Sequence, residues 1–562
     1  MSDNTTLRTP ADVMKLARMG AMHATRLSFM PNLVRRMARQ QWRFERTHFD
    51  LDSEGFGASA FTAHTPERSY TLVAFTRPLD PSERSDRVFA EAWDATFSLY
   101  DGIPDGAEIQ RLSQNTPLQE AGRFRETELV LARANKSMRL FEYIVENLAA
   151  GRQPDISRLN EVGYLMRTTA VYGNGKFGGA DRMRIASRPE TRVSFEVEML
   201  AVYLIRWFTI DLIEHVARAR GGENAVPLAP QLSRFLGIGN ATGLGMAPFL
   251  VRHPKLLHRW CLARETALAR VLQSTPGKNG ELSRLQALVT RVRQHLLEWN
   301  VEDPVQQARI EVLRQEIDTL AERINHSSLG EDVRPWQTLN NFAANFSLEG
   351  QELVVSLLIE VNGELVDDLA ESMYDEESWR LNPAQTVAEL KQLVSRNYAW
   401  VNDFDFSTPG SSARFWYYSE DKIEPRLGDR ETDSGAHLEM PLGIAHDVHQ
   451  LMLALETCPS EMTMAQFCRN HPDLRHVVRR VQSLDGYPYA EIQDNLLDTD
   501  LRPIDMLRFK LAFFGASKFD PKSDLWTRIT MFQGAPMPEE IQNPEVQDWA
   551  FPVKPLIAEA GA

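Results

Sequence analysis

Apolar residues recur at the spacing of one helix face over most of the chain. Residues 11–40 show this spacing with arginines between the apolar positions, as in a helix that packs on a core or lies on a membrane surface. Further along the chain, the same periodicity predicts helices over residues 84–99, 126–149, 191–219, 248–273, 281–298, 305–325, 385–400, 443–457 and 473–483.

One stretch near the N-terminus departs from the helical spacing. From Trp42 to Phe75 apolar and polar residues alternate, and Thr65, Pro66 and Glu67 interrupt the alternation as turn residues do. This pattern predicts a small antiparallel sheet with a hairpin. The expected fold class is therefore mainly α: a multi-helix protein with a small N-terminal α+β portion that contains the hairpin.

The length of the chain predicts several domains, because single cores stop growing beyond roughly 250–300 residues. The chain has 562 residues, and its best linker candidate is the segment STPGKNG at 274–280. We expect an N-terminal α+β portion over 1–120, a helical domain with glycine-rich loops over 121–275, and a C-terminal helical domain over 281–562.

The segment 305–324 carries a regular apolar seam surrounded by charges. A seam of this length is short for a coiled coil that stands alone. It indicates either a helical hairpin or a subunit contact, so a homo-oligomer is possible. The seam residues are Ile310, Leu313, Ile317, Leu320 and Ile324.

Composition narrows the classes of protein. The chain holds 62 Lys and Arg against 77 Asp and Glu, a formal net charge of −15. This excess of acid argues against a nucleic-acid partner, which would need a basic surface. No apolar run reaches the roughly 18 residues of a membrane span, and the first residues lack the order of a secretory signal. With only 3 cysteines and no cofactor motif, we expect a cytoplasmic protein without a cofactor.

The segment from Arg167 to Arg182 is the first candidate for chemistry. It contains a G-x-G-x-x-G pattern, but the buried strand and long helix of a dinucleotide-binding unit are not predicted around it. A glycine-rich loop that presents Tyr172 and Lys176 to a ligand is the functional interpretation, with Lys176 as an anion contact or a base. An exposed turn with a solvated lysine is the structural alternative.

A second glycine-rich segment runs from Leu236 to Phe249. It lacks the lysine of a phosphate-binding P-loop. Its small residues favour either close backbone packing or a turn whose amides, together with the basic residues that follow, bind a carboxylate or phosphate. Asn240 is the candidate substrate-binding residue in this segment.

The third segment, from Asn402 to Arg430, combines many aromatic rings with charged residues. Arginine can hold a carboxylate bidentately, so Arg414, Lys422 and Arg426 are candidate anion ligands, with Tyr417 beside them. The rings could also hold a quaternary ammonium group. An inter-domain seam of buried rings and ion pairs is the structural alternative.

Within this segment, Gly410-Ser411-Ser412-Ala413 resembles the start of the mobile serine loop of the aspartase/fumarase superfamily, a group of helical lyases. In that superfamily a serine of the loop abstracts a proton beside a carboxylate. The family's Met-Pro-x-Lys-x-Asn continuation is replaced here by Arg-Phe-Trp-Tyr-Tyr. The resemblance covers four residues and identifies no family, but it is compatible with proton abstraction on a helical scaffold.

A metal site is a weaker candidate. His437, Glu439 and His446 bring potential ligands together in sequence, and a non-haem metal site needs two histidines and a carboxylate. Solvated or core histidines are the commoner explanation. The cysteines lack C-x-x-C spacing, and no G-x-S-x-G nucleophile elbow occurs.

Together these features favour a cytoplasmic enzyme that acts on a small carboxylate-bearing anion by acid–base elimination or isomerisation, a lyase or isomerase. Tyr172 and Lys176 are the candidate catalytic residues. Arg167, Asn240, Arg414, Tyr417, Lys422 and Arg426 are the candidate substrate-binding residues, and no metal is assigned. The alternatives are a non-catalytic helical scaffold or binding protein, or a metal-dependent enzyme. The hypothesis requires at least two of the three segments to meet.

Overall fold

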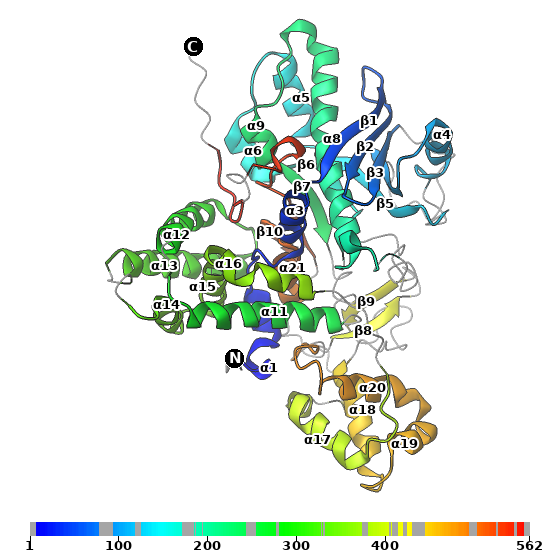
Figure 1. Ribbon diagram of the computed structural model, residues 1–562, viewed down its shortest axis with the longest axis vertical. Helices are drawn as coiled ribbons and strands as arrows, with labels where there is room; N and C mark the ends of the chain where they lie inside the picture. Colours follow the sequence, from blue (N-terminus) through cyan, green and yellow to red (C-terminus); the bar gives the residue numbers. More distant parts are fainter. Residues whose placement is uncertain are drawn as a thin grey trace.

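The computed structural model (Figure 1) describes residues 7–77, 94–118, 125–170, 185, 187–193, 195–242, 254–276, 280–326, 329, 332–373, 380–403, 406, 414–419, 424–429, 444–493, 503–523, 526–543 and 548–555. Across these residues, no helix is both long enough and apolar enough to cross a membrane.

The centre of the fold is a nine-stranded sheet in the order β1-β2-β3-β4-β5-β6-β7-β11-β10. Neighbouring strands run antiparallel except for β6 and β7, which run parallel. The strands are β1 (Arg43–Leu51), β2 (Gly57–His64), β3 (Ser69–Thr76), β4 (Ala95–Asp101), β5 (Glu128–Lys136), β6 (Tyr164–Thr168), β7 (Gly237–Thr242), β10 (Lys518–Ser523) and β11 (Trp526–Met531).

The expectation of a mainly α protein with only a small N-terminal α+β portion is wrong. The hairpin predicted over 42–75 is present as β1 to β3, but it is one end of the large sheet. Strand β5 and part of β4 lie inside segments predicted as helices, because short apolar runs do not distinguish a buried strand from a buried helix. The sheet takes strands from all three predicted domain ranges.

The long helix α8 (Glu196–Gly221) covers one face of the sheet. Phe61 of β2 and Phe97 of β4 contact Phe208 of this helix with ring centroids 5.9 and 5.5 Å apart. Most of α8 is buried, so its apolar residues surround the axis and do not form a single stripe. Acidic residues in its first turn and arginines in its last turn interact favourably with the helix dipole.

The opposite face of the sheet is covered only in part. Helix α4 (Gly106–Asn115) packs Leu112 against Val73 and Phe75 of β3. The register continues this face from Phe75 through Thr96 to Arg133 of β5. Beyond β5, the same face carries polar residues. The remaining helices around this half of the sheet are α5 (Phe141–Ala149), α6 (Ile156–Val162), α9 (Pro230–Phe235) and the 3-10 turns η3 (Pro189–Thr191) and η4 (Gly222–Asn224).

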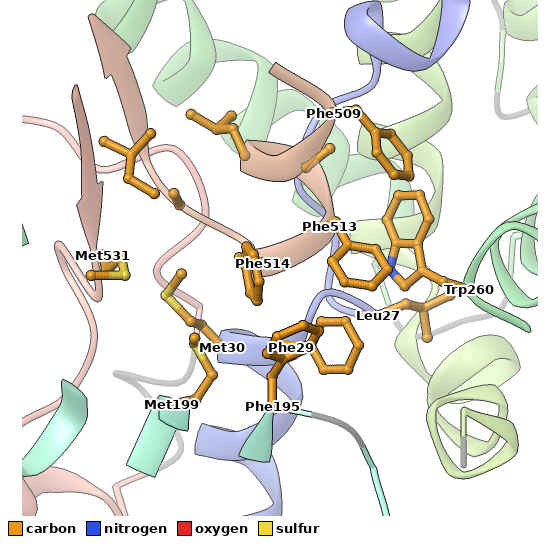
Figure 2. Packing of buried hydrophobic residues seen from close by; sticks show 14 of the residues in the cluster. Leu27, Phe29, Met30, Phe195, Met199, Trp260, Phe509, Phe513, Phe514 and Met531 are labelled. Atoms are coloured by element: carbon orange, nitrogen blue, oxygen red, sulfur yellow. The ribbon is translucent and has the colours of Figure 1, made fainter. Parts of the chain in front are cut away.

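The N-terminal residues and the C-terminal helix α21 (Pro503–Phe514) share one core. The residues predicted as amphipathic helix over 11–40 form α1 (Pro10–Val13), α2 (Leu16–Ala21) and α3 (Phe29–Arg39). Their apolar side chains are buried, so the interpretation as a helix that packs on a core is confirmed over the one that places it on a membrane surface. Figure 2 shows the aromatic contacts of this core. The ring centroids of Phe29 and Phe513 are 4.6 Å apart, and those of Phe195 and Phe514 are 4.8 Å apart.

A second group of helices packs beside this core. In it, α12 and α13 form a helical hairpin, and the apolar seam predicted in 305–324 is buried within the chain. The hairpin interpretation of that seam is therefore confirmed. The group consists of α11 (Pro254–Gln273), α12 (Glu281–Glu298), α13 (Pro304–His326), α14 (Pro335–Ala343), α15 (Leu348–Val361), α16 (Gly363–Val366) and η6 (Asp367–Ser372).

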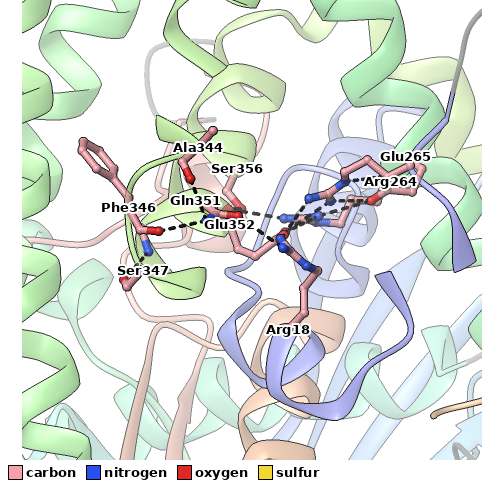
Figure 3. A network of polar contacts seen from close by, with 11 residues as sticks. Arg18, Arg264, Glu265, Ala344, Phe346, Ser347, Gln351, Glu352 and Ser356 are labelled. Atoms are coloured by element: carbon pink, nitrogen blue, oxygen red, sulfur yellow. Dashed lines mark hydrogen bonds and ion pairs between the residues drawn. The ribbon is translucent and has the colours of Figure 1, made fainter. Parts of the chain in front are cut away.

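A buried network of charges joins the N-terminal residues to this helical group (Figure 3). Arg8 donates to Glu265 of α11 and to Glu352 of α15 at 2.7 Å each, and Arg18 donates to Glu352 at 2.6 Å. Arg264 pairs with the same Glu352 carboxylate. The network thus fixes α1 and α2 against α11 and α15.

A further helical unit lies at one end of the molecule, with a two-stranded sheet next to it (Figure 1). Its docking contacts include Tyr489, which donates from its backbone N–H to Nδ1 of His258 on α11 and from its hydroxyl to the carbonyl of Arg8. The elements are α17 (Val387–Asn397), η7 (Ala399–Asp403), α18 (Ile444–Glu456), α19 (Met464–Asn470), η8 (Pro472–Leu474), α20 (Arg475–Ser483), β8 (Arg414–Ser419) and β9 (Glu424–Asp429); one more 3-10 turn, η9 (Pro538–Glu540), follows β11.

Candidate functional site

A row of four residues crosses the sheet and forms the floor of the candidate site. Asn135 of β5 pairs with Arg167 of β6, and Arg167 pairs with Gly239 of β7. Gly239 pairs in turn with Thr530 of β11. Directly paired residues project from the same face of a sheet, so this row exposes an amide, a guanidinium and a hydroxyl on the face opposite α8.

A second row lies two residues further along the strands and therefore on the same face. Ala241 of β7 pairs with Arg528 of β11, and Arg528 pairs with Asp520 of β10. Two arginines, Arg167 and Arg528, thus stand on either side of β7.

These rows open into a groove of about 1200 Å³, which we call the sheet-face groove. The segment after β5, helix α6 and the residues after α12 form its walls. Its polar and charged lining residues are Asp94, Asn135, Lys136, Ser137, Arg139, Asn160, Glu161, Tyr164, Arg167, Glu298, Asn300, Glu302, Asp520, Arg528, Thr530 and Lys554.

A glycine in β7 is required for the shape of the floor. A Cβ atom at Gly239 would lie 2.7 Å from three carbons of the Tyr164 ring, closer than any side chain tolerates. The absence of a side chain therefore lets the buried Tyr164 ring lie against β7. It also leaves the floor between Arg167 and Arg528 open.

The two arginines of the floor carry charge that the described residues do not neutralise. Among these residues, the guanidinium groups of Arg167 and Arg528 form no ion pair and no hydrogen bond, and Nε of Arg528 is buried. Oδ1 of Asn135 is also buried, and no hydrogen-bond partner lies within its reach. Buried polar atoms in folded proteins are normally satisfied, so such a cluster is typical of a surface that receives a ligand.

Several other charges of the groove are already engaged. Lys554 pairs with Glu298 at 3.4 Å, Asp94 accepts a hydrogen bond from the backbone N–H of Lys136, and the Lys136 ammonium lies 4.5 Å from the Phe141 ring centroid. The available cations are therefore Arg167 and Arg528 on the floor and the exposed Arg139 at the wall. Guanidinium groups bind carboxylate and phosphate oxygens bidentately, so the floor can hold a small anion.

The structure places Arg167 in this groove and pairs the first residues of two of the three segments proposed to meet. The segment that begins at Arg167 and the segment that begins at Leu236 pair directly through β6 and β7. Asn240 lies on the other face of β7, where its side chain donates to the Thr168 carbonyl at 2.7 Å. It joins β7 to β6 and does not line the groove.

The third segment contributes a separate hairpin. Arg414, Tyr417 and Arg426 lie on β8 and β9, where Tyr417 pairs with Arg426 and Arg414 with Asp429. Tyr172, Lys176 and Lys422 lie outside the described residues. These six residues remain predictions.

In the described part of the chain, no arrangement of side chains supports the metal hypothesis. Within this part, no group of three or more His, Cys, Asp or Glu side chains is arranged to hold a metal ion. His437 and Glu439 lie outside the described residues. His446, on α18, has Nδ1 4.0 Å from the carboxylate of the neighbouring Asp447.

Sequence reasoning missed Tyr164, Asn135 and Arg528. Arg528 begins a short alternation, Arg528 to Met531, whose period of two was the available signal for a strand. Nothing local indicates that this strand lies beside β7. Comparison of the chain with protein-family models, curated proteins and solved structures finds no match.

Proposed function

We propose that the protein is a cytoplasmic enzyme that binds a small carboxylate-bearing anion in the sheet-face groove. The observation that carries this proposal is the position of Arg167 and Arg528 on either side of Gly239, without an ion pair to any described residue. Each guanidinium offers two parallel N–H donors to a carboxylate. Asn135 and Thr530, in the same row as Arg167, would supply further polar contacts.

The reaction that we propose is acid–base elimination or isomerisation, with Tyr172 and Lys176 moving the proton. Their segment follows β6 directly in the sequence, after Arg167. In an elimination, the base takes the proton from the carbon next to the carboxylate, the C–H electron pair forms the double bond, and the leaving group departs with its own electron pair. Charge that builds up on the carboxylate during proton removal would be stabilised by Arg167 and Arg528.

Calorimetric titration tests the binding step. The ligands are succinate, fumarate, malate and inorganic phosphate, and the variants are Arg167→Met and Arg528→Met. Loss of one charged hydrogen-bonding partner costs about 1.5–3 kcal/mol, so each variant should bind the preferred anion at least about tenfold more weakly. Arg43→Met is the matched control, because Arg43 is an exposed arginine on β1 of the same sheet.

Two binding results and one kinetic result would contradict the proposal. One is the absence of binding by any of the four anions, and another is equal binding by wild type and Arg528→Met. For the reaction, Lys176→Ala should abolish turnover of the anion that binds, followed by ultraviolet absorbance of the new double bond, with an unchanged melting temperature. Tight binding without turnover in the wild type would show a binding protein and not an enzyme.

A further inference from the structure

A second hollow, separate from the floor of the groove, lies between the helices. This interhelical cavity measures about 320 Å³, within the size range of small-molecule sites. Its walls come from segments far apart in the chain: residues 23–26, α3, α12, the end of α15, the exit of α21 and residues 548–552. Arg284 and Asp548, with side chains 45% and 62% exposed, mark its mouth.

One arginine of the cavity lacks a counter-charge at hydrogen-bonding distance. Nη2 of Arg35 is buried and has no hydrogen-bond partner, and Nε lies 3.9 Å from the Asp367 carboxylate. That carboxylate is already held by Arg26, which donates to both of its oxygens at 2.6 and 2.8 Å. Arg26 also donates to the Glu360 carbonyl, so each of its three guanidinium nitrogens is engaged in a hydrogen bond. Arg35 is therefore the cation that can receive a ligand.

An acidic group faces the same cavity. Burial raises the pKa of Glu360 to about 7, although Arg26 and Arg35 both oppose the shift. The Glu360 carboxylate forms no ion pair with Arg35 in the described structure, so the two groups line the cavity without neutralising one another. Burial, with nearby arginines, also lowers the pKa of His23 to about 3, so this histidine adds no positive charge at neutral pH.

The rest of the cavity is mainly apolar. Leu288 and Leu296 of α12, Val361, Leu511, Trp299 and Trp549 line it. His295 donates from Nδ1 to the Pro552 carbonyl at 2.8 Å, which fixes the terminal segment as one wall. Inside its mouth, the cavity thus combines one arginine without a hydrogen-bonded counter-charge, Arg35, with one acid, Glu360, and several apolar side chains.

We propose that the interhelical cavity binds an α-amino acid with a large apolar side chain. Its carboxylate would pair with Arg35 and its ammonium group with Glu360, and its side chain would pack against Trp299 and the leucines of α12. A simple carboxylate would satisfy Arg35 but would leave Glu360 without a cationic partner whenever its carboxyl group is ionised, which is unfavourable. The site does not depend on the proposed function of the groove, because neither Arg35 nor Glu360 lines the groove.

Calorimetric titration of the full chain tests this site with four probes: L-phenylalanine, L-leucine, 3-phenylpropionate and phenethylamine. L-Phenylalanine should bind at least tenfold more tightly than 3-phenylpropionate, which lacks the amine, and phenethylamine, which lacks the carboxylate. Arg35→Met should weaken L-phenylalanine binding at least tenfold. Glu360→Gln should abolish the preference for L-phenylalanine over 3-phenylpropionate.

Two controls separate this site from general effects. Arg39→Met removes an exposed arginine of the same helix, which pairs with Glu371 at 2.7 Å, and should leave binding unchanged. Arg528→Met, in the sheet-face groove, should also leave it unchanged. If Arg35→Met does not fold, Arg35→Lys keeps the charge but loses the bidentate fork, and it should still weaken binding.

Equal binding of L-phenylalanine and 3-phenylpropionate by the wild type would overturn the proposal, and so would the absence of binding by all four probes. A crystal structure with L-phenylalanine gives a direct readout. Density between Arg35 and Glu360 supports the site, and density elsewhere refutes it.

Discussion

Arg264 and Glu352 form an ion pair of 2.8 Å between two side chains that are both 0% exposed. Burial alone would raise the pKa of the Glu352 carboxyl, but Arg8 and Arg264 outweigh burial and hold its pKa well below the ordinary value. Because Arg8 and Arg18 bind the same carboxylate, this one acidic group holds the N-terminal residues against α11 and α15.

Glu352→Gln should strongly destabilise the fold. It removes the closer counter-charge of the buried Arg264 and leaves only the Glu265 carboxylate, at 3.6 Å, and breaking a buried ion pair in this way costs about 3–5 kcal/mol. Urea denaturation followed by circular dichroism measures the loss. Glu364→Gln is the control, because Glu364 lies at the surface about 3.5 Å from Arg284, and it should change stability by less than about 1 kcal/mol. Equal effects of the two variants would contradict the role given to Glu352.

Gly239→Ala should disturb the sheet-face groove. The new Cβ would lie 2.7 Å from the Tyr164 ring, so the buried ring must shift over the floor of the groove. Overpacking of this kind costs about 1–3 kcal/mol. Anion binding should weaken together with stability, as measured by calorimetric titration and urea denaturation. Gly106→Ala adds a Cβ with no atom within 4 Å and should affect neither.

Glu360→Gln should stabilise the protein in alkaline solution. The folded-state pKa of about 7 exceeds the ordinary value of 4.5, so the folded state binds the proton more tightly than the unfolded state does. Stability from this group is therefore complete below pH 4.5 and is lost as the pH rises through 7. The shift corresponds to at most about 3 kcal/mol. In urea denaturation, the variant should be more stable than wild type at pH 8 and about as stable as wild type at pH 4.5. A gain in stability that is the same at both pH values would argue against a raised pKa of Glu360.

His258→Asn should make the protein less sensitive to acid. Nδ1 of His258 accepts the backbone N–H of Tyr489 at 3.0 Å, and burial, with Arg259, lowers the pKa of His258 to about 4. The unfolded state therefore takes up this proton first, and wild-type stability falls as the pH drops from 6.5 to 4. An asparagine can accept the same hydrogen bond without titrating.

Urea denaturation between pH 4 and 7 checks this expectation. The slope of stability against pH should be smaller in His258→Asn than in wild type. His326→Asn replaces an exposed histidine and should leave the slope unchanged. An identical slope in wild type and His258→Asn would show that folding does not lower the pKa of His258.

The helices were predictable where their apolar spacing is long and regular. The seam of α13, from Ile310 to Ile324, is an example, since each turn repeats the same local signal. Strand β7 has no such signal: its sequence, GIGNAT, is rich in glycine and poor in residues that favour strands. It is a strand because β6 and β11 lie on either side of it, and these neighbours come from distant parts of the chain.

The residues of the candidate site were likewise predictable only where a local feature of the sequence marks them. Arg167 was predicted because it stands next to a glycine-rich segment, which is a local feature. Arg528 was not predicted, since a single arginine in a short strand carries no local sign of function. Only the pairing of Gly239 with Thr530 brings Arg528 to the groove. Arg35 and Glu360 were also missed, because their shared cavity arises from helix packing.

The position of β7 between β6 and β11 also bears on how the chain is made. On the ribosome, β7 emerges long before residues 526–531, so one of its edges keeps open N–H and C=O groups while the residues between the two strands are made. Such an edge can recruit strands of other nascent chains, and we expect chaperones to be needed until β11 has emerged. A premature stop codon before residue 518 would remove strands β10 and β11 of the sheet. The same truncation would remove Arg528 from the groove and the Trp549 side of the interhelical cavity.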